Sequence, residues 1–258
     1  MKLTESLANR VVDLIVGVAV LGLAASLPAQ IPGKAEVRAI KGSATYSAAG
    51  AAPARLKVGT VLYSGSTIKT DSGSTVDLFM GKSAGFIRVT ANTTLALDKL
   101  AFTETGADTV VEVQLNLPEG TMLGNVNKLS AASKYEVKIP NGVAGIRGTR
   151  FRISSSGYVV LLDGSLIMVY VPTPGGTPIP YPLFGPPPQY FSPTEGVKPA
   201  PPDLINEVKN QGFGGGGPGN LPPGIPPAKG PDPLPFIPHK PNSETTPPNT
   251  APPPTQPP

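Results

Sequence analysis

The sequence contains no cysteine, no tryptophan and a single histidine. The absence of cysteine excludes disulfides, thiolate metal sites, iron–sulfur clusters and a cysteine nucleophile, and it leaves the redox compartment open. His239 lies in a proline-rich stretch near the C-terminus. A Ser-His-Asp relay or a multi-histidine metal site in the rest of the chain is therefore nearly excluded. We expect a protein that is not an enzyme and that uses no cofactor and no metal.

Proline is scarce in the first two thirds of the chain and abundant in the last third. Of the 34 prolines among 258 residues, 29 lie from Pro172 onward. A segment of this composition cannot bury enough apolar surface to offset the entropy that is lost on ordering it. Residues 172–258 are therefore predicted to be extended, largely polyproline II and disordered. The remaining chain is long enough for one domain of about 140 residues.

The first 29 residues have the layout of a secretory signal peptide. A basic start is followed by an uncharged run from Leu14 to Ala29 that ends in small residues. Cleavage after Ser26 keeps the better spacing of small residues, and cleavage after Ala29 is the alternative. The uncharged run is 16 residues long, shorter than the roughly 20 that a spanning helix needs. An uncleaved anchor and a buried core helix stay open as rival interpretations. We expect export to the periplasm or the cell surface, with membrane contact only through this segment if it is uncleaved.

From Val37 to Val171 apolar residues alternate with polar ones, which is typical of half-buried β-strands. Turn residues such as Asp, Asn, Gly and Pro separate the alternating runs. Short strands at this spacing predict one all-β domain over residues 35–171, a β-sandwich, a barrel or a β-solenoid-like fold. The runs are Val76-Leu78-Met80, Ile87-Val89, Leu95-Leu97, Val111-Val113-Leu115-Leu117, Tyr135-Val137-Ile139 and Phe151-Ile153.

The clearest local turn signal is Asp163-Gly164, between the apolar runs Tyr158–Leu162 and Ser165–Val171. Asp and Gly suit the positive φ angles of a two-residue hairpin turn, so a β-hairpin is predicted here.

Gly81–Gly85 matches the G-x-S-x-G pattern of a hydrolase nucleophile elbow. Strand patterns flank it on both sides and the domain has no histidine, so it too is predicted to be a hairpin turn.

Residues 141–152 concentrate glycine and arginine. One interpretation is a partner-binding loop, in which a backbone nest and an arginine fork hold an anion or a partner's carboxylate. The other is a tight strand connection in which glycines take special backbone angles and Arg147 binds carbonyl oxygens or an internal carboxylate. The candidate binding residues are Arg147, Arg150 and Arg152, and the candidate turn residues are Gly142, Gly145, Gly148, Asp163 and Gly164.

The domain is mildly basic: residues 30–171 carry 15 Lys and Arg against 10 Asp and Glu. With few aromatic residues to stack on bases, this charge does not predict nucleic-acid binding. It is compatible with anionic envelope polymers.

Asn92-Thr93-Thr94 is a formal glycosylation acceptor that we expect to face solvent and to which we assign no role.

The stretch from Val37 to Val171 resembles the FecR domain, named after a periplasmic regulator of ferric citrate uptake. RLKVGTVLYSGSTIKT is similar to the family's L-x-x-G-x-x-L-x-x-G-(D/S)-x-I-x-T signature, and KYEVKIPNGVAGIRGTRFRIS is similar to its closing segment. VRAIKGSATY, DSGSTVDLFM, GFIRVTANTTLALDKL and VEVQLNLPEGTMLGNVNKL resemble the family's other blocks. Ser66 stands where Asp is usual, and Ile139 stands where Thr is usual. The resemblance implies an extracytoplasmic all-β module.

In the iron-signalling members of that family, a cytoplasmic helical domain holds a sigma factor. A transmembrane helix, the FecR domain and a receptor-docking domain follow. This chain has about ten residues before its apolar segment and a proline-rich tail after Val171. We therefore expect that it does not carry out anti-sigma signalling alone. It looks like a stand-alone, secreted member.

The tail contains one segment of different character. Residues 203–210 follow two prolines, begin with an acid and precede a glycine, which predicts a short helix that is stable only when packed on the β domain. Tyr181, Phe184, Tyr190 and Phe191 are expected to dock either on the domain or on a partner. Residues 213–258 are predicted to be a disordered Gly/Pro-rich tail, either a spacer through the envelope or an inert solubilising segment.

These features favour an exported, non-enzymatic FecR-like binding or regulatory module that recognises an envelope protein or polysaccharide, with a link to extracytoplasmic signalling. The alternative is a structural envelope protein tethered to peptidoglycan or surface polysaccharide by its tail. A third, enzymatic hypothesis requires a carboxylate pair such as Asp77 and Glu112 to face a sugar-binding groove.

Overall fold

The computed structural model of the chain describes residues 30–105 and 108–213. The predicted signal peptide and the predicted tail from residue 214 onward lie outside the described residues. Within the described part of the chain, no helix is both long enough and apolar enough to span a membrane.

Almost all regular structure in the described residues is β-strand, which confirms the predicted all-β class. Most strands are short, and the four longest are β9, β10, β13 and β14. The elements are β1 (Gln30–Pro32), β2 (Ala35–Lys41), β3 (Ala44–Ser47), β4 (Ala54–Arg55), β5 (Val61–Leu62), β6 (Ser66–Thr70), β7 (Thr75–Phe79), β8 (Phe86–Val89), β9 (Thr94–Thr105), β10 (Asp108–Glu119), β11 (Thr121–Asn125), β12 (Lys134–Ile139), β13 (Gly142–Ser154), β14 (Val159–Tyr170), β15 (Ile179–Gly185), β16 (Gln189–Ser192), β17 (Gly196–Pro199), helix α2 (Pro202–Val208) and the π-helical turn η1 (Lys209–Phe213).

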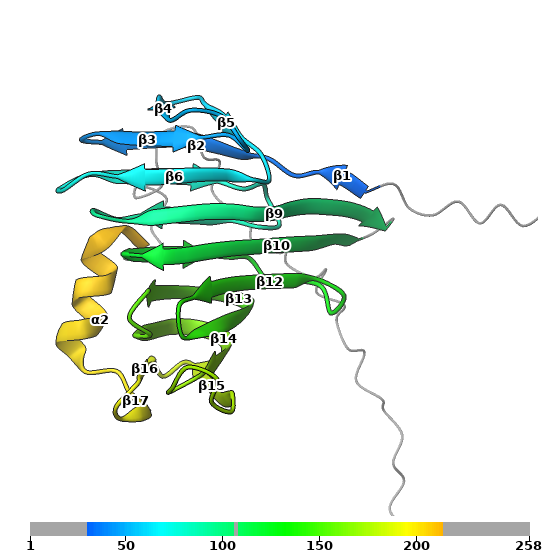
Figure 1. Cartoon of the computed structure of the whole chain (residues 1–258). Coiled ribbons are helices and arrows are strands. Elements are labelled where there is room, and N and C mark those ends of the chain that lie inside the picture. The colour runs from blue at the N-terminus through cyan, green and yellow to red at the C-terminus, as the bar shows by residue number, and fades with distance from the viewer. Residues whose placement is uncertain (1–29, 106–107, 214–258) are drawn as a thin grey trace, which may run out of the picture. The chain divides into compact units, whose positions relative to one another are not determined.

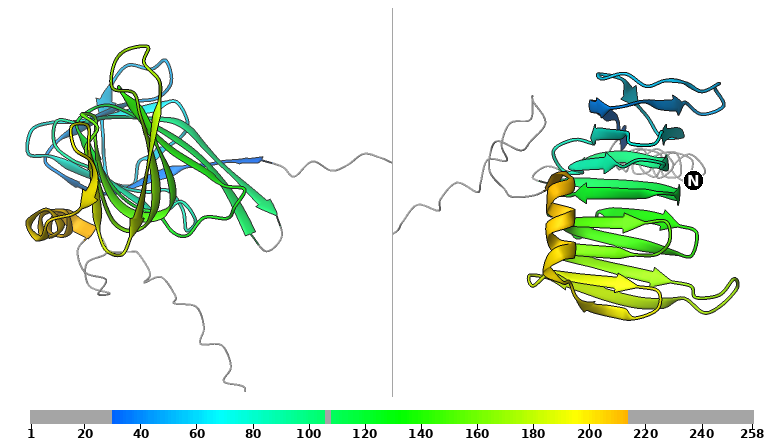
Figure 2. Two further views of the ribbon diagram at one scale, coloured as in Figure 1. Left: turned by 90° about the horizontal axis from the view of Figure 1, so that it is seen from below. Right: turned by 90° about the vertical axis from the view of Figure 1, so that its left-hand side faces the viewer.

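The strands form one curled sheet that closes around a core, so the β domain has two walls (Figures 1 and 2). The front sheet has the order β4-β3-β6-β9-β10-β12, then the first part of β13, the last part of β14, and β15. The rear sheet has the order β5-β2-β7-β8-β11, then the last part of β13, the first part of β14, β16 and β17. All these pairings are antiparallel except β10 with β12, because the intervening β11 belongs to the rear sheet.

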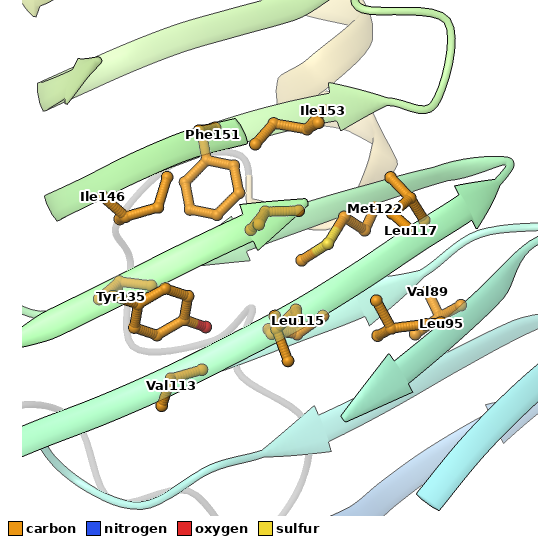
Figure 3. Packing of buried hydrophobic residues seen from close by; sticks show 14 of the residues in the cluster. Val89, Leu95, Val113, Leu115, Leu117, Met122, Tyr135, Ile146, Phe151 and Ile153 are labelled. Atoms are coloured by element: carbon orange, nitrogen blue, oxygen red, sulfur yellow. The ribbon is translucent and has the colours of Figure 1, made fainter. Parts of the chain in front are cut away.

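The core consists of the alternate residues that the apolar pattern singled out. Side chains from both sheets meet in it, and Figure 3 shows Tyr135 and Phe151 among aliphatic side chains. The ring of Phe151 fills the space above Gly124, where a Cβ would overlap it. Because the side chains of a strand alternate between its two faces, the neighbours of these core residues point outward and are available for other contacts.

Two long strands bend from one sheet into the other instead of ending. β13 bends at Gly148, with φ of 88°, and β14 bends at Gly164, with φ of 87°. Both halves of β14 pair with β13, Leu161 with Phe151 and Leu166 with Ile146. The predicted hairpin at Asp163-Gly164 is therefore wrong: the pair forms a bend within one continuous strand. The two signals look alike in sequence because both require a positive φ at glycine.

The sheet also continues beyond residue 171, where the sequence predicted its end. β15 extends the front sheet, and β16 and β17 extend the rear sheet. Pro180 and Pro182 are tolerated in β15 because it is an edge strand, where a residue without an N–H does not break the ladder. Phe191 is buried in the core, whereas Phe184 is 61% exposed.

Threonines line the corner where successive strands pass between the two sheets. The Thr93 hydroxyl donates to the carbonyl of Thr121 at 3.2 Å, and the N–H of Thr121 donates to the Thr93 hydroxyl at 3.0 Å. The N–H of Thr93 donates to the Thr70 hydroxyl at 3.0 Å. Thr93 is 1% exposed, so the expectation that Asn92-Thr93-Thr94 faces solvent is wrong for its middle residue.

Candidate functional site

The structure separates the three arginines of the predicted binding loop. Arg150 and Arg152 lie on the outer surface of the rear sheet, and Arg147 lies at the bend where β13 leaves the front sheet. The Arg150 guanidinium forms an ion pair with Asp163, which is its partner residue across strands β13 and β14. Asp163 is therefore an internal carboxylate partner of Arg150, whereas the structural interpretation placed such a partner at Arg147.

Arg152 forms an ion pair with a residue that is distant in sequence. Its Nη1 donates to the Glu207 carboxylate of helix α2 at 2.9 Å. Arg152 therefore holds the helix against the rear sheet.

The side chain of Arg147 is exposed to solvent. Its Nη1 donates to the carbonyl of Ala131 at 3.1 Å and, more weakly, to that of Ser133 at 3.5 Å. Carbonyl groups orient a guanidinium without neutralising it. Among the three predicted binding residues, Arg147 is therefore the one whose positive charge a partner can use.

The predicted turn glycines have different roles. Gly148 is the only one of Gly142, Gly145 and Gly148 with a positive φ. Gly142 is required by close packing, because a Cβ there would overlap the carbonyl oxygen of Val169. At Gly145 the nearest atom to an added Cβ would be 3.9 Å away, so this position does not require glycine.

Two lysines from neighbouring loops lie at the same edge as Arg147. Strand β11 pairs with β8 on one side and with β13 on the other, so the loops at the ends of these strands are adjacent. Lys82 lies in the hairpin turn before β8, and the Asn127 amide donates to its carbonyl oxygen. Lys128 follows β11, and its backbone lies directly against Gly148. We call Lys82, Lys128 and Arg147 the basic ridge.

Each residue of the basic ridge is exposed. Within the described residues none of the three forms an ion pair with a carboxylate, whereas Arg150 and Arg152 both do. Neighbouring strands of a sheet are about 4.8 Å apart, so the loops at the ends of adjacent strands lie next to one another. The ridge is suited to binding an anionic group or chain.

A second charged site lies on the outer surface of the rear sheet. Arg88 Nε and Nη2 donate to the two carboxylate oxygens of Asp77, each at 2.6 Å. The remaining nitrogen, Nη1, donates to the carbonyl of Gln211 in η1, also at 2.6 Å. The hydrogen bond to Asp77 raises the pKa of Arg88 above its usual value. Arg88 thus links two rear strands to the C-terminal end of the described chain.

An exposed charge cluster joins β16 to β17. Glu195 accepts hydrogen bonds from Lys198 Nζ and from the Tyr190 hydroxyl, both at 2.7 Å. The bond from Lys198 is the main cause that lowers the pKa of Glu195. The same carboxylate raises the pKa of Tyr190 and that of Lys198.

The structure does not bring together the carboxylate pair that was named for the enzymatic hypothesis. Asp77 lies on the outside of the rear sheet in its pair with Arg88, and Glu112 lies on the outside of the front sheet, 2.7 Å from Lys99 Nζ. The two carboxylates therefore do not share a groove.

In the described part of the chain, no three acidic or histidine side chains gather as metal ligands would. Gly81–Gly85 is a hairpin turn between the paired strands β7 and β8, as predicted.

Comparison with known proteins gives one family match and two similar solved structures. Residues 66–166 match the family model described as FecR protein. No curated protein matches the chain. Two crystal structures of a candidate anti-sigma factor from Parabacteroides distasonis ATCC 8503, at 1.65 and 2.50 Å resolution, are similar, with TM-scores of 0.40 and 14% sequence identity. The similarity covers 57% of this chain and 64% of the Parabacteroides chain, less than two thirds of its length. Residues 66–166 of the chain are therefore similar to the FecR protein family.

Proposed function

We propose that this protein is a non-enzymatic FecR-type binding and regulatory module that acts outside the cytoplasm, in the periplasm or at the cell surface. The family match supports the regulatory role. The signal-peptide layout of residues 1–29 supports export. Its partner is an envelope protein or polysaccharide rather than a nucleic acid.

The observation that carries the proposal is the basic ridge. Lys82, Lys128 and Arg147 are exposed at one edge of the domain without carboxylate partners in the described residues, while Arg150 and Arg152 are engaged internally. The partner therefore presents carboxylates or phosphates to these three side chains. Rim charges of this kind mainly increase the association rate and the specificity of a complex, and salt screens their effect.

The proposal is tested by capture from cell-envelope fractions of the producing organism, with the full-length exported protein as bait. A second bait is the double variant Lys82→Glu with Lys128→Glu, which reverses two charges of the ridge and leaves the Arg147 hydrogen bonds in place. We expect the captured component to be lost from this double variant. Capture by the unmodified protein should also weaken as the salt concentration rises.

The matched control is Lys41→Glu with Lys69→Glu, which makes the same charge change at two exposed lysines away from the ridge. The control should retain the captured component. Equal loss from both double variants would show that net charge alone matters, and unchanged capture by the ridge variant would overturn the proposed site.

A further inference from the structure

Helix α2 and the turn η1, which we call the strap (residues 202–213), cross the rear strands on the outside of the sheet (Figures 1 and 2). Val208 is 1% exposed beneath the strap, and Leu204 and Ile205 pack beside it. Leu123 of β11 and Val160 and Leu162 of β14 form the surface below. This apolar cluster is separate from the main core.

Two arginines flank the apolar surface and hold the polar side of the strap. Arg152 binds the Glu207 carboxylate, and Arg88 binds the backbone carbonyl of Gln211. Gly212, with φ of 127°, lies so close to Arg88 that a Cβ would overlap its guanidinium. Leu123, Val160, Leu162, Arg88 and Arg152 together form a surface that fits a short amphipathic helix with an acidic residue beside its apolar stripe. We call it the rear groove.

The strap itself is a weak occupant of the rear groove. Helix α2 has seven residues, fewer than an isolated helix needs to be stable in water, and no side chain caps its N-terminus. Its ion pair with Arg152 involves a carboxylate that is half exposed. The side-chain oxygen Oε1 of Gln211 is buried and receives no hydrogen bond in the described structure. The contacts of the strap are therefore few and incompletely satisfied.

We propose that the rear groove is a binding surface for an amphipathic helix of a partner protein, and that the strap occupies it in the resting protein and is displaced on binding. This interface is separate from the basic ridge and does not depend on the ridge having a partner.

The contacts of the strap define the partner's chemistry. The helix carries apolar residues four positions apart, as Leu204 and Val208 are, and a carboxylate placed like that of Glu207 to meet Arg152. At its C-terminal end a second carboxylate can replace the Gln211 carbonyl on Arg88. A charged acceptor there forms a stronger hydrogen bond than a neutral carbonyl does, which favours the partner over the strap.

The test uses a fluorescein-labelled peptide of residues 201–213 as the probe and full-length protein as the receptor. Leu204→Ser with Val208→Ser weakens the strap and leaves the groove intact. We expect saturable binding of the peptide to this strap variant. Binding to the unmodified protein should be weaker by about tenfold or more, because the groove is open in only a small fraction of molecules.

Exchanging the charges of Arg152 and Glu207 tests whether the peptide binds at the proposed surface. Adding Arg152→Glu to the strap variant should abolish binding of the probe and permit binding of a peptide that carries Glu207→Arg. Circular dichroism and urea unfolding establish that each variant is folded. A folded strap variant that does not bind the probe, or equal binding by the unmodified protein and the strap variant, would overturn the proposal.

Hydrogen exchange of the unmodified protein provides an independent measurement. A displaceable strap should exchange its α2 amides much faster than the amides of β13 and β14. If α2 exchanges only as slowly as those core strands, the strap is a permanent part of the fold and the proposal is wrong.

Discussion

Arg88 donates a hydrogen bond to the carbonyl of Gln211 at 2.6 Å and so joins strand β8 to the strap, 123 residues further along the chain. The same guanidinium binds Asp77 through its other two nitrogens. A planar fork with five donors allows both contacts at once, which an ammonium group does not reproduce. Arg88 is therefore one of the two arginine side chains of the β domain that hold the strap.

Replacing this arginine tests that role. Arg88→Lys keeps the positive charge and loses the bidentate contact, so we expect the free energy of unfolding to fall by about 1–3 kcal/mol. The α2 amides should also exchange faster. Lys99→Ala, which breaks the exposed pair with Glu112, is the control and should change stability by less than about 1 kcal/mol. A similar loss in both variants would contradict the account.

The bend at Gly164 should not tolerate a side chain. Its φ is 87°, and a Cβ would overlap the carbonyl oxygen of Gly148 on the neighbouring strand. Gly164→Ala is expected to lower the free energy of unfolding by about 2 kcal/mol or more. Gly145→Ala, where no atom lies within 3.9 Å of the added group, should cost less than about 1 kcal/mol. Urea denaturation of both variants measures the difference.

The hydroxyl of Tyr135 is expected to contribute little to stability. It is buried, burial raises its pKa, and its hydrogen bond is to the Met80 sulfur, a weak acceptor, at 3.8 Å. Tyr135→Phe keeps the ring shown in Figure 3 and should change the free energy of unfolding by less than about 1 kcal/mol in either direction. Tyr135→Ala leaves a cavity and should cost about 3–5 kcal/mol. If the Phe variant were as unstable as the Ala variant, the hydroxyl would be essential.

The carboxyl group of Glu195 should titrate below the usual range for glutamate. Lys198 is the main cause, so Lys198→Ala should raise the pKa of Glu195. Because the folded-state pKa is lowered, the stability from this cluster is present above the ordinary glutamate pKa and is lost as the pH falls through the folded value. NMR titration of the carboxyl carbon measures both proteins, and an unchanged pKa in the variant would contradict this assignment.

The alternating apolar residues predicted the strands and the core well, because alternation is a local property of the chain. Val113, Leu115 and Val137 are all fully buried. The bend at Asp163-Gly164 is not predictable from the sequence because a bend and a hairpin have the same local chemistry, and only the pairing of β14 with β13 distinguishes them. The strands beyond residue 171 are not predictable either, because proline-rich composition masks an edge strand that tolerates proline.

The candidate site was only partly predictable. Arg147 was identified, but its neighbours Lys82 and Lys128 lie in other loops, and only the order β8-β11-β13 brings them together. Glu207, the partner of Arg152, lies 55 residues away in sequence. The register of the sheet determines such long-range contacts, and a single sequence does not reveal that register.

The central claim is that the basic ridge contacts an envelope partner. The most direct measurement is photo-crosslinking in living cells of the producing organism, with a photoreactive amino acid in place of Lys82 or, as the control, Lys41. The account predicts a specific crosslinked product with an envelope component from position 82 and none from position 41. No product from position 82, or the same product from both positions, would contradict it.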